Sequence, residues 1–142
     1  MRKVADILKR KGSHVETVQS ELTVIDALRL MADKNIGSVA IAQSDKFIGL
    51  MTERDYSRKV ILKGRSSSET TVGEIMNTEY PSVVGNDSVE HCMALMSSNN
   101  LRYLPVVEQG RLAGIISIND VVTETILTQK ETIEHLQNYI HS

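Results

Sequence analysis

The hydrophobic and polar positions of this 142-residue chain follow one pattern twice. In the first copy a short extended piece (16–18) precedes a segment from Thr23 whose apolar residues recur every three or four positions, and two short apolar runs (38–42 and 47–51) follow. A period near 3.6 predicts an amphipathic helix, whereas two short apolar runs joined by a polar turn predict a β-hairpin. With a closing helix after the hairpin, the pattern predicts a β-α-β-β-α unit.

The second copy is found by shifting the sequence by 65 residues, which aligns the two halves without a gap from about residue 16 to residue 56. Asn35 then falls on Asn100, and Gly49 falls on Gly114. The matching elements are an extended piece at 81–84, a helix from Ser88, and strands at 104–107 and 112–116. Thr23 and Ser88 occupy the N-cap positions of the two helices, and the turns Ser44-Asp45 and Gln109-Gly110 join the two hairpins.

This repeat sets the expected architecture. A unit of about 60 residues is only marginally stable alone, so we expect an α/β (α+β) fold in which two repeats pack as one pseudo-symmetric module. The first repeat, with an N-terminal helix, is assigned to 1–65, and the second, with a linker and a long C-terminal helix, to 66–142. The segment 63–70 is linker-like, and residues 4–7 resemble 72–75.

The last helix is predicted from about Ile118 to Tyr139. Within it, six mostly apolar residues alternate at spacings of four and three positions. Residues with this spacing line one side of a helix and form a seam that packs against another helix. The helix is longer than one repeat needs, so a subunit interface and a homodimer are expected. These positions are Val122, Ile126, Gln129, Ile133, Leu136 and Ile140.

The chemistry is expected where the second strand of each hairpin ends. Both copies read glycine, two apolar residues, a hydroxyl residue (Thr52 or Ser117), two variable residues and an aspartate (Asp55 or Asp120). One interpretation is structural, because a hydroxyl followed three residues later by an acid approximates a helix capping box. The other is functional, because a helix N-terminus suits a phosphate and an ionised carboxylate suits ribose hydroxyls. Arg54 would add a forked phosphate donor.

This duplicated ending resembles the CBS (cystathionine β-synthase) domain pair, or Bateman module. Residues 101–107 (LRYLPVV) resemble the strand signature of that family. Residues 52–56 (TERDY), followed by 58–60 (RKV) and 64–67 (GRSS), resemble a group of stand-alone bacterial and organellar pairs. The resemblance covers nearly the whole chain. It implies that an adenosyl compound binds in the cleft between the two repeats.

The resemblance also implies a role for each site residue. Asp55 and Asp120 would hold ribose. Thr52, Arg54, Ser117, Asn119 and Arg102 would face phosphate. The adenine would lie against the backbone near Gly37, Ser38 and Val39 and the loop that runs from His14 to Thr17, or, in the second copy, against the loop from Tyr80 to Ser82. The second repeat has Asn119 where the first has Arg54, and Gly37 stands where the second repeat has Arg102, so the two sites should differ in phosphate affinity.

Composition narrows the function classes. A net charge of −2 lacks the basic excess of a nucleic-acid binder, and no apolar run approaches the ~20 residues that span a bilayer. The N-terminus has no signal-peptide pattern, and one cysteine (Cys92) permits no internal disulfide. We therefore expect a cytoplasmic protein. The basic triplet 9–11 is interpreted as a solvated helix end, and no histidine has metal-ligand spacing.

The leading hypothesis is a regulatory module that binds an adenine nucleotide (AMP, or NAD(H) or ATP, with S-adenosylmethionine also open) and signals to an unknown effector protein. One rival is a protein-interaction module without ligand, in which the motifs only cap helices. The other is an enzyme, for which the sequence shows neither a metal site nor a general base aimed at a phosphate. No catalytic cofactor and no catalytic residue are expected.

Overall fold

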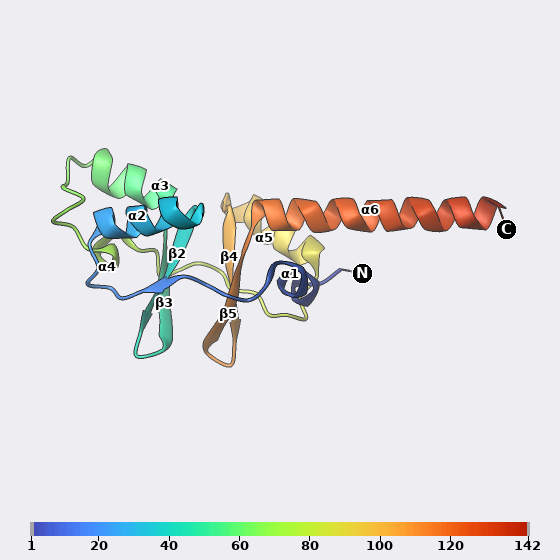
Figure 1. The fold of residues 1–142 in the computed structure, drawn as a ribbon, viewed down its shortest axis with the longest axis horizontal. Coiled ribbons are helices and arrows are strands. Elements are labelled where there is room, and N and C mark those ends of the chain that lie inside the picture. The colour runs from blue at the N-terminus through green and yellow to red at the C-terminus, as the bar shows by residue number, and fades with distance from the viewer. Residues whose placement is uncertain (1, 142) are drawn as a thin grey trace. The chain divides into compact units, whose positions relative to one another are not determined.

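The first repeat forms the predicted elements in a computed structural model that describes residues 2–141 (Figure 1). After β1 (Thr17–Val18) come α2 (Val24–Lys34), β2 (Ser38–Gln43) and β3 (Lys46–Thr52). β1 pairs with β2 in parallel and β2 pairs with β3 antiparallel, in one three-stranded sheet. The predicted strands are confirmed to within one residue at each end.

The closing helix of the first repeat departs from the regular form. It begins as α3 (Glu53–Tyr56) and continues as η1 (Ser57–Ile61), a single stretch of π-helix. Its wider turn is closed by the Leu62 N–H, which donates to the Ser57 carbonyl at 3.0 Å. A π-turn adds one residue to a helical turn, a local change that apolar periodicity does not reveal.

The second repeat contains α5 (Val89–Asn99), β4 (Tyr103–Glu108), β5 (Arg111–Ser117) and α6 (Ile118–His141). Its first strand is reduced to one parallel bridge between Val83 and Val106. That bridge corresponds, 65 residues later, to the pairing of Val18 with Ile41 in the first repeat. The long C-terminal helix is thus confirmed, and it ends two residues beyond the prediction.

Local signals position these elements as the sequence indicates. The Thr23 hydroxyl accepts from the Asp26 N–H, and the Ser88 hydroxyl accepts from the His91 N–H. α2 and α5 end at asparagines in the left-handed region, with φ of 54° at Asn35 and 53° at Asn100. Both hairpin turns have positive φ at their two central residues, as the right-handed twist of the strands requires.

The chain divides into two compact units that do not follow the order of the repeats. Unit 1 comprises the segment ending at Ser13, Pro81–Glu108 and the segment beginning at Ala113; unit 2 comprises His14–Tyr80 and Gln109–Leu112. The N-terminal helix, α1 (Val4–Lys11), therefore packs with the second repeat. α4 (Val72–Ile75), which precedes the second repeat in the sequence, packs with the first.

Hydrogen bonds and burial explain this exchange of the leading helices. The N–H groups of Val4 and Ala5 donate at 2.9 Å to carbonyls in the loop before α5, and Ile7 is fully buried in the core of unit 1. The Val72 N–H donates to the Leu22 carbonyl at 2.8 Å. The sequence pattern grouped the N-terminal helix with the first repeat, whereas in the structure this helix packs with the second. The boundary between the repeats at 65/66 concerns their order along the chain and stays a prediction.

The linker-like segment 63–70 is tied to the first repeat rather than free. The N–H groups of Val24 and Ile25 donate to the carbonyls of Thr70 and Ser67 at 2.8 and 2.9 Å. Each unit has its own aliphatic core. The fully buried residues of unit 1 include Val4, Ile7, Cys92, Leu104, Val106, Ile116 and Val121; those of unit 2 include Val24, Ala27, Val39, Ile41, Met51, Val60 and Val72.

Candidate functional site

In the first repeat the candidate site is the junction between β3 and α3. The Thr52 N–H donates to Asp55 Oδ2 at 2.9 Å, and the Asp55 N–H donates to Thr52 Oγ1 at 3.2 Å. The Thr52 hydroxyl also donates to Asp55 Oδ2 at 3.0 Å. These reciprocal bonds form the predicted capping box. Both side chains are buried, so the carboxylate is held in one orientation.

A lysine compensates the charge of this carboxylate. Lys59, one helical turn after Asp55, places Nζ 3.2 Å from Asp55 Oδ1 and donates to the Ile75 carbonyl at 2.9 Å. The lysine therefore links the junction to the C-terminus of α4. The resemblance includes Lys59 in a family segment but implies no role for it, although an acid and a lysine four positions apart on a helix are a recognised pairing signal.

The second repeat builds the same junction between β5 and α6. The Ser117 N–H donates to Asp120 Oδ2 at 2.8 Å, and the Asp120 N–H donates to Ser117 Oγ at 3.1 Å. Both residues are half-buried, so this junction is more open to solvent than that of the first repeat.

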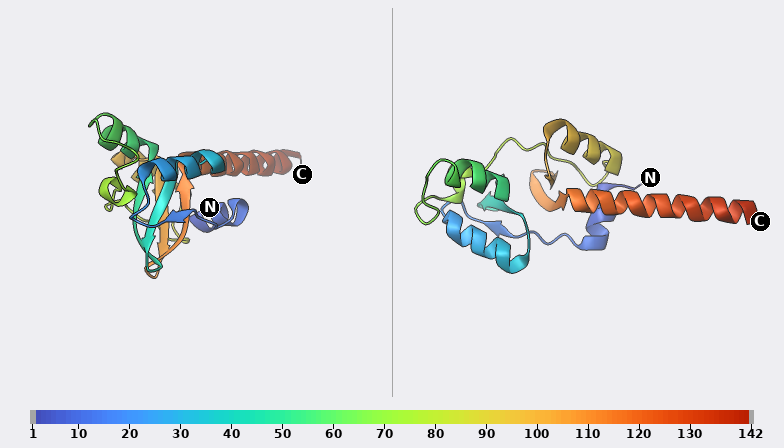
Figure 2. Two further views of the ribbon diagram at one scale, coloured as in Figure 1. Left: turned by 60° about the vertical axis from the view of Figure 1, so that its left-hand side comes forward. Right: turned by 90° about the horizontal axis from the view of Figure 1, so that it is seen from above.

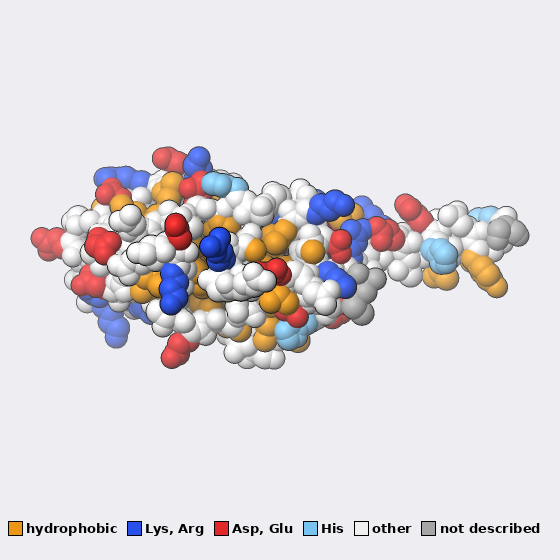
Figure 3. Space-filling model, turned by 90° about the horizontal axis from the view of Figure 1, so that it is seen from below, with side chains coloured by type: hydrophobic (Ala, Val, Ile, Leu, Met, Phe, Trp, Pro, Cys, Tyr) orange, Lys and Arg blue, Asp and Glu red, His pale blue; other side chains and the backbone are white. Residues whose placement is uncertain are grey.

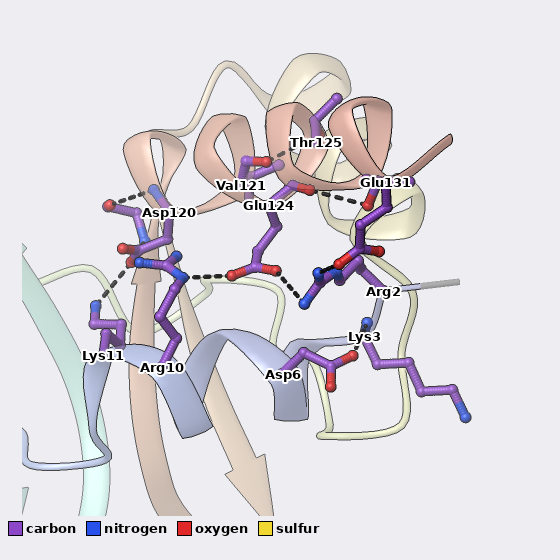
Figure 4. A network of polar contacts seen from close by, with 12 residues as sticks. Arg2, Lys3, Asp6, Arg10, Lys11, Asp120, Val121, Glu124, Thr125 and Glu131 are labelled. Atoms are coloured by element: carbon purple, nitrogen blue, oxygen red, sulfur yellow. Dashed lines mark hydrogen bonds and ion pairs between the residues drawn. The ribbon is translucent and has the colours of Figure 1, made fainter. Parts of the chain in front are cut away.

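Here the compensating cation comes from another helix. Lys11, at the end of α1, donates from Nζ to Asp120 Oδ2 at 2.7 Å and to the Ile115 carbonyl at 2.8 Å (Figure 4). Burial alone would raise the pKa of Asp120. The hydrogen bond and charge of Lys11, together with the Ser117 N–H and hydroxyl, outweigh burial, so the pKa lies below its usual range. The interpretation of residues 9–11 as a solvated helix end is thus incomplete, because Lys11 is exposed but also pairs with a half-buried carboxylate.

The two repeats differ in charge at one equivalent position. Lys59 of the first repeat corresponds to Glu124 of the second. A glutamate one turn after Asp120 would repel its carboxylate, and Glu124 is fully buried. Arg10 compensates, with Nε 2.6 Å from Glu124 Oε1, and Arg2 Nη1 lies 3.5 Å from Oε2 (Figure 4). A basic N-terminal helix therefore supplies to the second repeat the charges that the first repeat carries on its own helix.

In unit 2 the structure gathers most of the predicted residues. Ser38 pairs with Thr52 across the β2–β3 ladder, and the Gly37 carbonyl accepts from the Glu53 N–H at 3.2 Å. Thr17 is exposed on β1, where it pairs with Ala40 of β2. Val39 is fully buried, so only its backbone can face a ligand. Arg54, within the first turn after Thr52, is half-buried.

Unit 1 gathers the equivalent residues of the second repeat. The Arg102 carbonyl accepts from the Ile118 N–H at 2.8 Å, which matches the bond between Gly37 and Glu53. The side chains of Arg102, Asn119 and Ser82 are exposed. Tyr80 is the exception, because it belongs to unit 2 whereas Ser82 belongs to unit 1.

Potential metal ligands, the cysteine and the long helices are the other features that bear on chemistry. Among residues 2–141, no three His, Cys, Asp or Glu side chains are grouped so that they could hold a metal ion. Cys92 is buried in the core of unit 1, and burial raises the pKa of its thiol to about 11. That value describes an unreactive thiol. Over the same residues, no helix has the length and apolar character needed to cross a bilayer.

Comparison with known proteins agrees with this geometry. The family model of the CBS domain matches twice, at 4–61 and 72–126. The CBS domain-containing protein CBSX3, mitochondrial, of Arabidopsis thaliana is 34% identical over 146 residues, which cover 96% of this chain and 71% of that protein.

Two solved structures extend the comparison. A protein with CBS domains from Burkholderia ambifaria superposes with a TM-score of 0.86 at 44% identity, covering 90% of this chain and 96% of that one. The hexameric CBS-CP12 protein of bloom-forming cyanobacteria has a TM-score of 0.75 at 28% identity, covering 85% and 66%.

Proposed function

Because the chain belongs to the CBS domain family, we propose that it is a regulatory module that binds an adenine nucleotide at the strand–helix junctions of its repeats. Binding changes the relative stability of two conformations, and an effector protein responds to that change. In this proposal the chain acts in the cytoplasm and is a sensor rather than an enzyme.

The observation that carries the proposal is the pair of matching junctions. In each repeat a strand ends at a hydroxyl residue whose N–H binds the aspartate three positions on, at 2.9 Å in the first repeat and 2.8 Å in the second. This bond holds each carboxylate beside a helix N-terminus, where backbone N–H groups favour a phosphate. A carboxylate oxygen has more than one lone pair, so each aspartate can also accept from ribose hydroxyls.

The proposed sites are unequal. The first repeat contributes Arg54, whose planar guanidinium suits phosphate oxygens, but its aspartate is more deeply buried. The second repeat has the neutral Asn119 at the same position and gains Arg102, which is exposed. Two arginines favour a ligand that carries phosphate, such as AMP, ATP or NAD(H), over S-adenosylmethionine.

One observation favours the rival function of an interaction module without ligand. In both junctions the aspartate already accepts a backbone N–H and pairs with a lysine, so helix capping alone accounts for these residues. A ribose would have to share each carboxylate with Lys59 or Lys11. Only a binding measurement separates the two functions.

Isothermal titration calorimetry of the nucleotide-stripped protein against AMP, ATP, NAD, NADH and S-adenosylmethionine provides that test. We expect saturable binding of a phosphate-bearing ligand. Asp55→Asn keeps the size of the side chain and removes its charge, so affinity should fall about 10- to 100-fold, as expected when a charged hydrogen-bond acceptor is lost.

Glu74→Gln is the matched control, because Glu74 closes an equivalent capping box at α4, where its carboxylate accepts from the Thr71 N–H at 2.7 Å. It removes one negative charge from the same unit without touching the motif, so affinity should stay unchanged. The absence of saturable binding by the wild-type protein would leave the interaction module as the function. Equal losses in both variants would show that the nucleotide does not bind at the Asp55 junction.

A partner must exist for either function. We include self-association as a homodimer in the proposal, since one relative of known structure is described as hexameric. The effector protein is a partner distinct from the second copy.

A further inference from the structure

α6 carries an apolar stripe that its own unit leaves uncovered. Five large side chains on one face are between 44% and 74% exposed, and Figure 3 shows hydrophobic side chains on the surface of the helix toward its C-terminal end. With Gln129 between them, they follow the alternating four- and three-residue spacing of a coiled-coil seam. They are Val122, Ile126, Ile133, Leu136 and Ile140.

The opposite face of the helix is the one that unit 1 uses. Val121 and Glu124 are fully buried, and Glu131, two turns after Glu124, pairs with Arg2. If Ile126 and Ile133 take heptad position a, then Glu124 and Glu131 take position f, on the far side of the helix from the seam. The contacts that anchor α6 to its unit therefore turn the apolar stripe outward.

The second half of α6 packs little against its own unit. Every residue of 129–141 is exposed, and this part of the helix, roughly 20 Å long, extends beyond the other elements of unit 1 (Figures 1 and 2). An isolated helix of this length is marginal in water, and β-branched residues such as Thr132 and Ile133 weaken it further. The match to the CBS domain ends at residue 126, so the repeat does not require this extension.

We propose that α6 pairs with α6 of a second copy of this chain, in a parallel two-stranded coiled coil over residues 122–140. Isoleucine occupies every a position (126, 133 and 140), and leucine occupies d at 136. This distribution favours parallel dimers over trimers and tetramers. The inference does not depend on nucleotide binding.

Orientation follows from two polar residues. In the parallel register Gln129 faces Gln129 of the partner subunit, so each amide can donate to and accept from the other. An antiparallel register that matches all six layers places Gln129 against isoleucine and brings Lys130 near its own copy. A buried unpaired amide and a pair of like charges both disfavour that arrangement.

The charges on α6 favour a second copy of this chain as the partner of the seam, over a different helix or a membrane surface. The positions that flank the seam carry one charged side chain, Lys130, so they lack the complementary charges that select a different helix. They are Thr123, Thr125, Lys130, Thr132, Gln137 and Tyr139. α6 as a whole carries four acidic side chains and one lysine, whereas helices that lie on anionic membranes are basic on their polar face.

Sedimentation equilibrium of the full chain with Ile133→Glu/Leu136→Glu tests the seam. Both side chains are exposed within one chain, so the variant should keep its fold and nucleotide binding, while the dissociation constant of the dimer should rise about 100-fold or more. His135→Glu/Asn138→Glu is the matched control, because it adds two glutamates to the opposite half of the same helix and should leave the dimer intact. A monomeric wild-type protein, or equal dimerisation by both variants, would overturn the proposal.

Ile140→Cys tests the orientation. In a parallel dimer the two cysteines at position 140 meet and form an intermolecular disulfide on mild oxidation, seen as a dimer on non-reducing electrophoresis. In an antiparallel dimer position 140 lies near position 122 of the partner, and no disulfide forms. The wild-type chain, whose Cys92 is buried, provides the uncrosslinked control, and failure of Ile140→Cys to crosslink would refute the parallel pairing.

Discussion

Replacing Arg10 by methionine should destabilise the protein more than replacing the glutamate with which it pairs. Glu124 is fully buried, whereas the side chains of Arg10 and Arg2 are 38% and 27% exposed. Arg10→Met removes the 2.6 Å bond to Oε1 and leaves the carboxylate with Arg2, whose Nη1 is 3.5 Å from Oε2. Among the described residues, Oε2 accepts no hydrogen bond, so the variant contains a buried and poorly compensated charge.

The magnitude follows from which partner can reach water. Breaking a buried pair by removing one member costs about 3–5 kcal/mol when the other charge stays buried. We expect about 3 kcal/mol for Arg10→Met, because Arg2 still compensates part of the charge. Glu124→Leu leaves two half-exposed guanidinium groups that water can solvate, and the leucine remains buried, so its cost should be about 1 kcal/mol.

Urea denaturation of both single variants and of the double variant measures the difference. With slopes of about 1–3 kcal/mol/M, a gap of 2 kcal/mol separates the midpoints by roughly 1 M. The double variant should be more stable than Arg10→Met alone, because it no longer contains the stranded carboxylate. Protein concentration must be constant, since self-association shifts apparent stability.

Arg29→Met is the control, because Arg29 pairs with Asp26 at 3.0 Å with both side chains exposed. It should change stability by less than about 0.5 kcal/mol. The reasoning is refuted if Glu124→Leu costs as much as Arg10→Met, or if the double variant shows the sum of the two single losses.

Two further predictions concern acid and thiol chemistry. The pKa of Asp120 is depressed in the folded state, so its contribution to stability is present above the unfolded-state pKa of about 4 and is lost as pH falls through the folded-state pKa. Melting temperatures from pH 7 to pH 2 should therefore fall less steeply for Asp120→Asn than for the wild type, and parallel curves would contradict the assignment. Cys92, buried and with a pKa of about 11, should resist a thiol reagent at pH 8 in the folded protein and react in urea; rapid labelling of the folded chain would show that the core of unit 1 opens readily.

Much of each candidate site could be predicted from the sequence because its geometry is local. The bonds between Thr52 and Asp55 and between Ser117 and Asp120 span three residues, and the order of residue types is enough to indicate them. The same local geometry does not identify the ligand. Capping and ribose binding use the same residues in the same geometry, so the pattern predicts the junction without naming its ligand.

The cations at the two junctions show where sequence reasoning stops. Lys59 lies four residues from Asp55, within the reach of local rules, but Lys11 lies 109 residues from Asp120. A basic residue at an exposed helix end has the same local sequence whether it is solvated or paired. Comparison of the two repeats does indicate a missing cation. The second repeat has Glu124 where the first has Lys59, so its junction needs positive charge from elsewhere in the chain.

The amino-acid pattern predicts the two repeats, their main strands and helices, the caps and the hairpin turns, because each depends on periodicity or on contacts over a few residues. That α1 closes the core of the second repeat while α4 closes that of the first follows from long-range packing. The tertiary structure also decided that Glu124 is buried between arginines and that the seam of α6 faces outward. These outcomes depend on which apolar faces and charges meet across separations from 50 residues (Val72 to Leu22) to 114 residues (Arg10 to Glu124). Local periodicity carries no information about that choice.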